Sequence, residues 1–335
     1  MNIDSPRTLR GPIDGAGLRP DLELKKADLH LHSNVSYDVL NLPELSPRSL
    51  YDRAVERGMG FFTLTDHETI RGIQKLRREL DEEFDGAPPI PVITGIEMKV
   101  RDPKIGHTIH VNVLGLDQRQ MLELARRRKS VDRFLDFCRS EDLYHAYNHP
   151  FWFEPGERAP LSTVTELIDR FPVIELNAGR IPQLNGRTLE IAQRFGKQLV
   201  AASDSHTGRI GKAFTMAPGA TPEEFLRNIR NGAWRAVPNH TSFLGFIEEV
   251  QDTIELVFLK QSAFQVKDTF LRQKPMARRI TRAALGSEFV MRPWFFKRVV
   301  GKAMKMMAVP PAYAFILQQR MMHRGLGHAD SEATA

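Results

Sequence analysis

The stretch Asp28-Leu29-His30-Leu31-His32 indicates the kind of fold that this chain adopts. It follows Ala27 as a short segment, and we expect a strand over residues 27–32. Side chains alternate between the two faces of a strand, so His30 and His32 would point to the same side. Two imidazoles at one strand end form half of a metal site. A pair of surface or core histidines explains this motif equally well when it is taken alone.

Strand-like and helix-like segments alternate along the chain after this stretch. We expect further strands over residues 61–65, 91–100, 109–116, 144–148, 173–177 and 199–202. We expect helices over residues 47–58, 70–84, 118–141, 163–170, 184–195 and 221–231. Such alternation is typical of βα units around a mostly parallel sheet. About seven strands in roughly 220 residues predict an α/β fold with a closed or nearly closed barrel.

Residues with metal-binding side chains follow the expected strands at their C-terminal ends. In a (β/α) barrel these ends meet on one face, and that face carries the active site. The residues placed in this way are His30, His32, Asp66, His67, Glu97, His149, Glu175, Asn177, Asp204 and His206. Side chains that are far apart in the sequence would thereby come within metal-binding distance of one another.

Each of these signals is weak when it is taken alone. Asp66 could instead cap the helix expected from residue 70, and Glu97 could be an ordinary exposed glutamate at a strand end. His110 lies inside an expected strand and is a better ligand candidate than His107, which falls in the preceding loop. His149 could be a turn histidine. The recurrence of such residues at successive strand ends is what indicates a metal site.

The order of these motifs resembles the PHP family, whose name stands for polymerase and histidinol phosphatase domains. The motifs are D-x-H-x-H at 28–32, an aspartate at 38, T-D-H at 65–67, G-x-E at 95–97, a histidine at 110, N-H-P at 148–150 and S-D-S-H at 203–206. The resemblance covers about residues 24–239. It implies a distorted (β/α)7 TIM-like barrel with up to three divalent metal ions.

The resemblance also implies a distribution of ligands among these ions. One ion would be held by His30, His32, Glu97 and Asp204. Glu97 would bridge to a second ion, which is completed by His110 and His149. Asp38, His67 and His206 would hold the third ion.

The ligand types agree with this assignment on chemical grounds. Nitrogen and carboxylate ligands without thiolates suit Mn²⁺, Fe²⁺ or Zn²⁺. The chain has a single cysteine, Cys138, which excludes a disulfide framework and a thiolate zinc cluster within one chain. Adjacent divalent ions can generate hydroxide at neutral pH and bind both the attacking and the leaving oxygen of a phosphoryl group. The sequence contains no nucleophile-elbow, P-loop or Rossmann fingerprint.

We therefore expect a metal-dependent phosphoesterase with two or three divalent ions per chain, acting through metal-bound hydroxide on a phosphomonoester or on a nucleotide or oligonucleotide phosphodiester. Catalytic roles fall to Asp204 and His206, and to Asp66 as an orienter of a histidine ligand. Two alternatives stay open. The first is a non-catalytic, metal-stabilised scaffold or regulatory domain, and the second is a hydrolase of a non-phosphate bond.

A phosphoesterase needs cations beside its metal ions to bind the phosphate. Arg180 and Arg187 follow the strand end at Asn177, and Arg209 follows the S-D-S-H motif. We expect substrate binding by Arg180, Arg187, Arg209 and Asn177. A solvated or ion-paired surface arginine is the alternative for each of the three. The sequence does not specify whether the substrate is a sugar phosphate, a nucleotide or an oligonucleotide.

The charge distribution divides the chain. The 335 residues have a net charge of +6, with 41% hydrophobic and 26% charged residues, which is ordinary globular composition. Residues 260–324 contain 14 Lys and Arg against Asp268 and Glu288, so this segment carries about +12 and the remainder about −6. We expect an N-terminal leader over 1–22, the barrel over 23–240 and a basic, mainly helical C-terminal extension over 241–335.

The basic extension has three interpretations. Residues 289–307 interleave apolar and basic side chains, as a basic amphipathic helix would. Such a helix binds an anionic membrane surface, binds nucleic acid phosphates, or simply packs on the barrel with its lysines exposed. Without an apolar leader or a long apolar stretch, we expect the cytoplasm as the location, with peripheral attachment to a membrane as an option.

Overall fold

The computed structural model describes residues 11–154, 156–249, 309, 313–314 and 316–320. Most of the basic segment 260–324, including the helix expected over 289–307, lies outside the described residues. Within the described part, no helix is long and apolar enough to cross a membrane.

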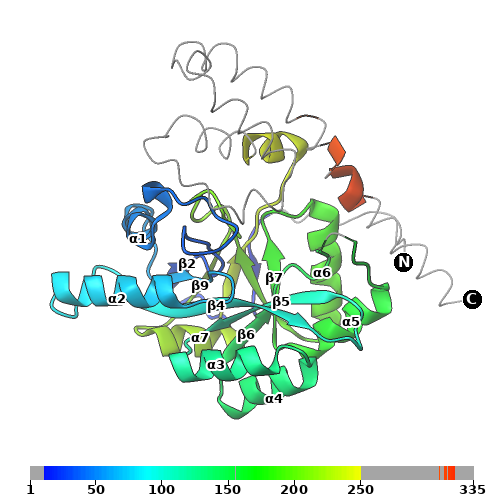
Figure 1. Cartoon of the computed structure of the whole chain (residues 1–335), viewed down its shortest axis with the longest axis horizontal. Helices are drawn as coiled ribbons and strands as arrows, with labels where there is room; N and C mark the ends of the chain where they lie inside the picture. The colour runs from blue at the N-terminus through cyan, green and yellow to red at the C-terminus, as the bar shows by residue number, and fades with distance from the viewer. Residues whose placement is uncertain (1–10, 155, 250–308, 310–312, 315, 321–335) are drawn as a thin grey trace, which may run out of the picture.

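The strands form two sheets, with helices packed around them (Figure 1). The strands are β1 (Ile13–Asp14), β2 (Lys25–Ala27), β3 (Phe62–Leu64), β4 (Val92–Arg101), β5 (Thr108–Leu114), β6 (Tyr144–Tyr147), β7 (Val173–Asn177), β8 (Gln198–Ala202), β9 (Phe214–Ala217) and β10 (Arg235–Val237). The helices are the 3-10 turn η1 (Pro43–Leu45), α1 (Pro47–Glu56), α2 (Arg71–Glu83), α3 (Gln118–Arg127), α4 (Val131–Ser140), α5 (Leu161–Arg170), α6 (Pro182–Arg194) and α7 (Pro222–Arg230).

The larger sheet has six strands in the order β3-β4-β5-β6-β7-β8 and is curled. The pairs β3·β4, β6·β7 and β7·β8 are parallel, whereas β4·β5 and β5·β6 are antiparallel. The sheet is therefore mixed, which corrects the expectation of simple βα repetition. Only residues 102–107 connect β4 to β5, and a parallel crossover needs about a dozen residues or more.

Residues 28–32 are not the regular strand that the sequence predicts, because β2 already ends at Ala27. They nevertheless lie between the two edges of the curled sheet. The carbonyl of His30 accepts from Asp204 N at 2.9 Å on the β8 side, and the carbonyl of Leu31 accepts from Thr65 N at 2.8 Å on the β3 side. The described residues thus form a six-stranded half-barrel whose edges meet at an irregular segment, rather than a regular closed (β/α)7 barrel.

Two other expectations differ from the structure. The helix expected over 118–141 is two helices, α3 and α4, because Ser130 begins a new helix by accepting a hydrogen bond from Arg133 N. Part of the expected N-terminal leader is ordered, since β1 pairs with β10 in the smaller, antiparallel sheet β1-β10-β9-β2.

The buried core of the curled sheet holds the polar residues at its strand ends in place. Every residue of β5 and β7 is buried, and α2 packs Ile73, Leu76 and Leu80 against the sheet at helical spacing. Polar residues that follow such strands are held on a rigid support. The chain therefore presents its chemistry-bearing side chains from strand ends that cannot shift independently.

Candidate metal centre

All nine side chains predicted as metal ligands come together at one end of the curled sheet. They form four overlapping groups, and within each group the potential ligand atoms lie within 4.8 Å of one another. The groups are His32, Asp38, His67 and His206; His30, His32 and Asp204; His30, Glu97 and His149; and His67, Glu97 and His110. No other group of this kind occurs among the described residues.

Glu97, near the middle of β4, lies at the centre of the cluster and is 1% exposed. Its Oε2 atom lies 3.3 Å from His30 Nε2 and 3.1 Å from His67 Nδ1. Its Oε1 atom lies 3.0 Å from His110 Nδ1 and 3.4 Å from His149 Nε2. Each carboxylate oxygen thus faces a different set of imidazoles, which is the arrangement that a bridging ligand requires.

Asp204 approaches the same centre from the end of β8. Its Oδ1 atom lies 3.3 Å from both His30 Nε2 and His32 Nε2, and these two nitrogens are 3.1 Å apart. Its Oδ2 atom accepts a hydrogen bond from Asn177 Nδ2 at 3.1 Å. Two ring nitrogens and a carboxylate oxygen therefore converge on one small volume.

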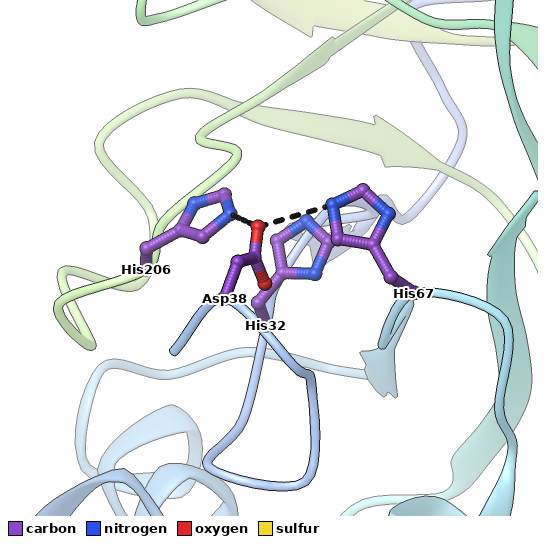
Figure 2. Close-up of side chains that lie close together, drawn as sticks. All are labelled: His32, Asp38, His67 and His206. Atoms are coloured by element: carbon purple, nitrogen blue, oxygen red, sulfur yellow. Dashed lines mark hydrogen bonds and ion pairs between the residues drawn. The ribbon is translucent and has the colours of Figure 1, made fainter. Parts of the chain in front are cut away.

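Figure 2 shows the third part of the cluster, where Asp38 lies between two imidazoles. Asp38 Oδ2 is 2.9 Å from His206 Nε2 and 3.2 Å from His67 Nε2, and the ring of His32 stacks on both of these imidazoles. Burial alone would lower the pKa of His206, but Asp38 raises it to about 9. The same pairing brings the pKa of Asp38 well below its ordinary range despite burial.

The electrostatics of the centre favour cations. Burial would raise the pKa of Glu97, but His30 and other nearby histidines hold it well below its usual value, and the pKa of Asp204 is lowered for the same reasons. Burial and neighbouring imidazoles lower the pKa of His32 to about 3, so this ring is neutral at pH 7 and keeps a free lone pair. The site thus combines ionised carboxylates with a neutral imidazole.

The donor set fits divalent metal ions. Ring nitrogens and carboxylate oxygens are the ligands that Mn²⁺, Fe²⁺ and Zn²⁺ accept. His67 Nδ1 is buried 3.1 Å from a carboxylate oxygen of Glu97 but has no hydrogen bond to any described residue. Two ligands of one metal ion would lie close together without a hydrogen bond between them, as these two atoms do. A buried nitrogen that has neither a hydrogen bond nor a metal ion would cost free energy.

The backbone is strained at two residues of the cluster. His149 and Asp204 both have positive φ angles, of 30° and 52°. Conformations of this kind cost roughly 1–3 kcal/mol for a residue other than glycine and persist where the surroundings enforce them. Here the two residues place the His149 ring 3.4 Å from Glu97 and the Asp204 carboxylate 3.3 Å from His30.

A second layer of contacts orients the cluster. Glu175 Oε2 lies 2.7 Å from His30 Nδ1, so His30 donates its Nδ1 proton there and leaves Nε2 facing the other ligands. Asn177 donates to Glu175 and to Asp204. Asn148 donates to Glu97 at 2.9 Å. The sequence places Glu175 at a strand end, and its contact with His30 becomes visible only in the structure.

The cluster forms the floor of an open cavity of about 400 Å³. Its rim carries two cations, Lys99 and Arg180, and three aromatic side chains, Tyr37, Trp152 and Phe246. Lys99 pairs with Glu154, which also lines the cavity, and its ammonium group lies 5.5 Å from the centre of the Tyr37 ring. Lys99 was missed from the sequence, yet it comes two residues after Glu97 on β4 and so shares its face of the sheet.

The four residues predicted to bind substrate are not equally placed. Arg180 lines the cavity. Arg187 lies on α6 and pairs with Glu190 one turn later, and neither Arg187 nor Arg209 is among the residues that line the cavity. Asn177 is fully buried below the cluster, where it holds other side chains rather than facing the cavity.

Two further expectations concern residues beside the cluster. Asp66 is buried and accepts hydrogen bonds from Ser33 N at 2.6 Å and from Ser33 Oγ at 2.7 Å. It therefore braces the segment that follows His32, and it is not among the residues that line the cavity. Of the two histidines at 107 and 110, only His110 contacts Glu97, since His107 Nδ1 is bonded to the carbonyl of Ile105.

The fold and the site define a class of α/β proteins that gather histidine and carboxylate ligands at the ends of the strands of a curled sheet. Part of the chain is similar to the PHP family. The family model described as "PHP-associated" matches residues 182–234, from α6 to the loop before β10. The motif order in residues 28–206 and the convergence of its residues agree with this similarity.

Known proteins that are similar to this chain include a curated relative and a solved structure. A 5'-3' exoribonuclease of Haemophilus influenzae is 35% identical over 109 residues, which are 32% of this chain and 35% of that protein. The match thus spans about a third of that relative's length. The crystal structure of PsfC from Pseudomonas syringae superposes with a TM-score of 0.50 at 17% identity, covering 72% of this chain and 99% of that one. At this identity the second likeness concerns the fold alone.

Proposed function

We propose that this chain is a metal-dependent phosphoesterase of the PHP type that hydrolyses a phosphate ester of a nucleotide or an oligonucleotide. The observation that carries the proposal is the convergence of nine ligating side chains around Glu97, at the floor of a cavity with cations on its rim. A buried cluster of this size has no evident structural purpose, because clustered buried charges do little for stability on their own.

The proposal assigns the ligands to two or three divalent ions. His30, His32 and Asp204 would share one ion with Glu97, and the pair His110 and His149 would complete a second ion on the other oxygen of Glu97. Asp38, His67 and His206 would hold a third. Bound divalent ions supply Lewis acidity and lower the pKa of water. The proposal includes Mn²⁺, Fe²⁺ and Zn²⁺ as candidates for the native ion.

The other side chains of the cavity would bind and orient the substrate. Arg180 and Lys99 can bind phosphate oxygens, Arg180 through its planar guanidinium and Lys99 as a point charge. Glu175 would keep His30 in the tautomer whose Nε2 is free to bind a metal ion, and Asn177 would fix the direction of the Asp204 carboxylate. Arg187, Arg209 and Asn177 are not among the residues that line the cavity, so the proposal gives them no substrate contact.

The preference for a nucleotide or oligonucleotide rests on two supporting observations. Tyr37, Trp152 and Phe246 give the cavity aromatic faces, on which bases stack favourably. The curated relative that matches 109 residues is named a 5'-3' exoribonuclease. Because that match covers only about a third of the relative, the substrate class stays a proposal.

Three coarser features of the chain also stay proposals. Residues 28–32 would complete a distorted seven-stranded (β/α) barrel, as their hydrogen bonds to both edges of the curled sheet suggest. The chain would divide into a leader over 1–22, a barrel over 23–240 and an extension over 241–335. The third proposal is a cytoplasmic location, with residues 260–324 contacting an anionic membrane or nucleic acid.

The test is phosphate release by the purified, Mn²⁺-loaded full chain from a panel of a 5′-nucleotide, a nucleoside bisphosphate, a short RNA, histidinol phosphate and a sugar phosphate. His32→Ala removes a ligand, whereas His107→Ala removes a buried histidine outside the cluster and serves as the matched control. We expect activity in the wild type and in His107→Ala, and its loss in His32→Ala. A metal-loaded wild type that is silent across the panel would contradict the proposal.

A further inference from the structure

The loop Gly179-Arg180-Ile181, between β7 and α6, brings Arg180 to the rim of the cavity. Burial lowers the pKa of this guanidinium, and Asp204, Glu175 and Glu249 act against that shift. The Nε atom of Arg180 is buried and makes no hydrogen bond to any described residue. The backbone of the loop therefore sets the point from which Arg180 extends its charge toward the cavity.

On the inner side, Asn177 holds the loop. Gly179 N donates to Asn177 Oδ1 at 2.7 Å, and Arg180 N donates to the carbonyl of Asn177 at 3.1 Å. Because Asn177 also donates to Asp204, the loop is tied to the metal cluster through one side chain.

On the outer side, the loop is held by residues from beyond position 240. Ile181 N donates to Gln319 Oε1 at 2.9 Å, and Gln319 Nε2 donates to the carbonyl of Gly179 at 3.4 Å. Thr241 N donates to the carbonyl of Arg180 at 2.9 Å. Gln319 therefore spans the loop with both ends of its amide.

The burial of Gln319 shows that this contact is specific. Glutamine is mostly exposed in proteins, yet Gln319 is only 3% exposed, and Ile316 one turn earlier is 7% exposed. Gln318 and Leu317, between them, are exposed. The helical residues 316–320 thus pack one face against the protein, and the polar group on that face is satisfied by the Arg180 loop.

We propose that Gln319 is a positioning residue: the C-terminal segment packs onto the loop 179–181 through this side chain and thereby sets where Arg180 presents its charge to a phosphate in the cavity. Only one part of this inference rests on the proposed function, namely that Arg180 binds a phosphate. It makes the described residues 316–320 a structural part of the substrate site.

The first arm of the test measures the contact itself. Gln319→Met keeps the side-chain volume and removes both hydrogen bonds, and Gln318→Met is the matched control at the exposed neighbour. We expect hydrogen exchange of the Ile181 amide in the full chain to become about tenfold faster in Gln319→Met and to stay unchanged in Gln318→Met.

The second arm measures the consequence for binding, with inorganic phosphate as the probe and calorimetry on the Mn²⁺-loaded full chain. We expect the Kd for phosphate to rise about fivefold to tenfold in Gln319→Met. In an Arg180→Ala background the same substitution should add nothing, because its effect runs through Arg180. For any panel ester that is hydrolysed, KM should rise while kcat is retained.

Four results would overturn the proposal. They are unchanged exchange at Ile181 in Gln319→Met, faster exchange without a change in phosphate affinity, an undiminished effect of Gln319→Met in the Arg180→Ala background, and a wild type that does not bind phosphate. A failure of the proposed function looks different. In that case no ester is hydrolysed, but the phosphate Kd still responds to Gln319→Met through Arg180.

Discussion

Replacing Glu175 by glutamine tests how the cluster keeps His30 ready to bind a metal ion. The substitution is nearly isosteric, and residue 175 is buried at the end of β7. Asn177 Nδ2 donates to Glu175 Oε1, so the glutamine must place its carbonyl oxygen at that position. Its amide NH₂ group then faces His30 Nδ1, which lies 2.7 Å from the other oxygen in the wild type.

The consequence is a change of tautomer. With a metal ion bound, wild-type His30 would donate from Nδ1 and offer an unprotonated Nε2, whereas opposite an NH₂ group it must accept at Nδ1 and carry its proton on Nε2. That Nε2 atom is the one that lies 3.3 Å from both Glu97 and Asp204. Loss of such an orienting partner typically weakens metal binding by about 10- to 100-fold, which corresponds to about 1.4–2.8 kcal/mol.

The measurement is a competition titration of Mn²⁺ or Zn²⁺ against a chromophoric chelator, with the metal content determined after dialysis. Glu166→Gln on α5 is the control, because this glutamate is exposed and undergoes the same chemical change. Circular dichroism verifies that the fold is retained. If Glu175→Gln binds metal as tightly as both the wild type and Glu166→Gln, Glu175 does not orient His30 and the reasoning is refuted.

Two further predictions follow from the same region. Gly95→Ala should lower the free energy of unfolding by about 1–3 kcal/mol, because the added Cβ would lie 2.5 Å from Thr63 Oγ1 and 2.7 Å from the Leu64 carbonyl. Urea denaturation measures this, and an unchanged midpoint would show that β3 and β4 separate without cost. Removal of metal ions by chelation should lower Tm, since an ion at 100 times its Kd stabilises the native state by about 2.7 kcal/mol. Calorimetric scans of the metal-loaded and chelated protein check this, and equal Tm values would argue against bound ions.

The cluster could be predicted because its geometry follows from local rules. Residues two apart at a strand end share a face, and the C-terminal ends of parallel strands meet on one side of a sheet. His30 and His32 illustrate the first rule, although the structure makes their segment irregular rather than a strand. The side chains are brought together by the neighbouring segments even where the predicted secondary structure is not formed.

The rim of the cavity could not be predicted in the same way. Arg187 follows a strand end as Arg180 does, but it falls on α6, where its direction depends on the rotation of the helix and on an ion pair with Glu190. Phe246 lies beyond the expected end of the barrel at residue 240, and no local pattern indicates that this segment returns to the cavity. Substrate contacts depend on tertiary packing that sequence periodicity does not encode.

Of the two antiparallel pairings in the curled sheet, one could be predicted from the sequence and the other could not. The antiparallel pairing of β4 and β5 could have been predicted, because residues 102–107 are too few for a crossover. The antiparallel pairing of β5 and β6 could not, because α3 and α4 lie between them, as in an ordinary parallel unit. Ser130 is a missed helix start of the kind that capping rules describe.

The segment 28–32 has a consequence for how the protein is made. Asp28 accepts a hydrogen bond from Ser203 N across 175 residues, so His30 is joined to Asp204 only after nearly all of the barrel has been synthesised. At about 5–20 residues per second, the ribosome needs roughly 10–35 s to add that intervening length. During this interval the nascent chain exposes two histidines without the aspartate that completes their site. A metal ion held jointly by His30, His32 and Asp204 could therefore bind only after this long-range contact has formed, and a chain that stalls before Ser203 lacks the complete site.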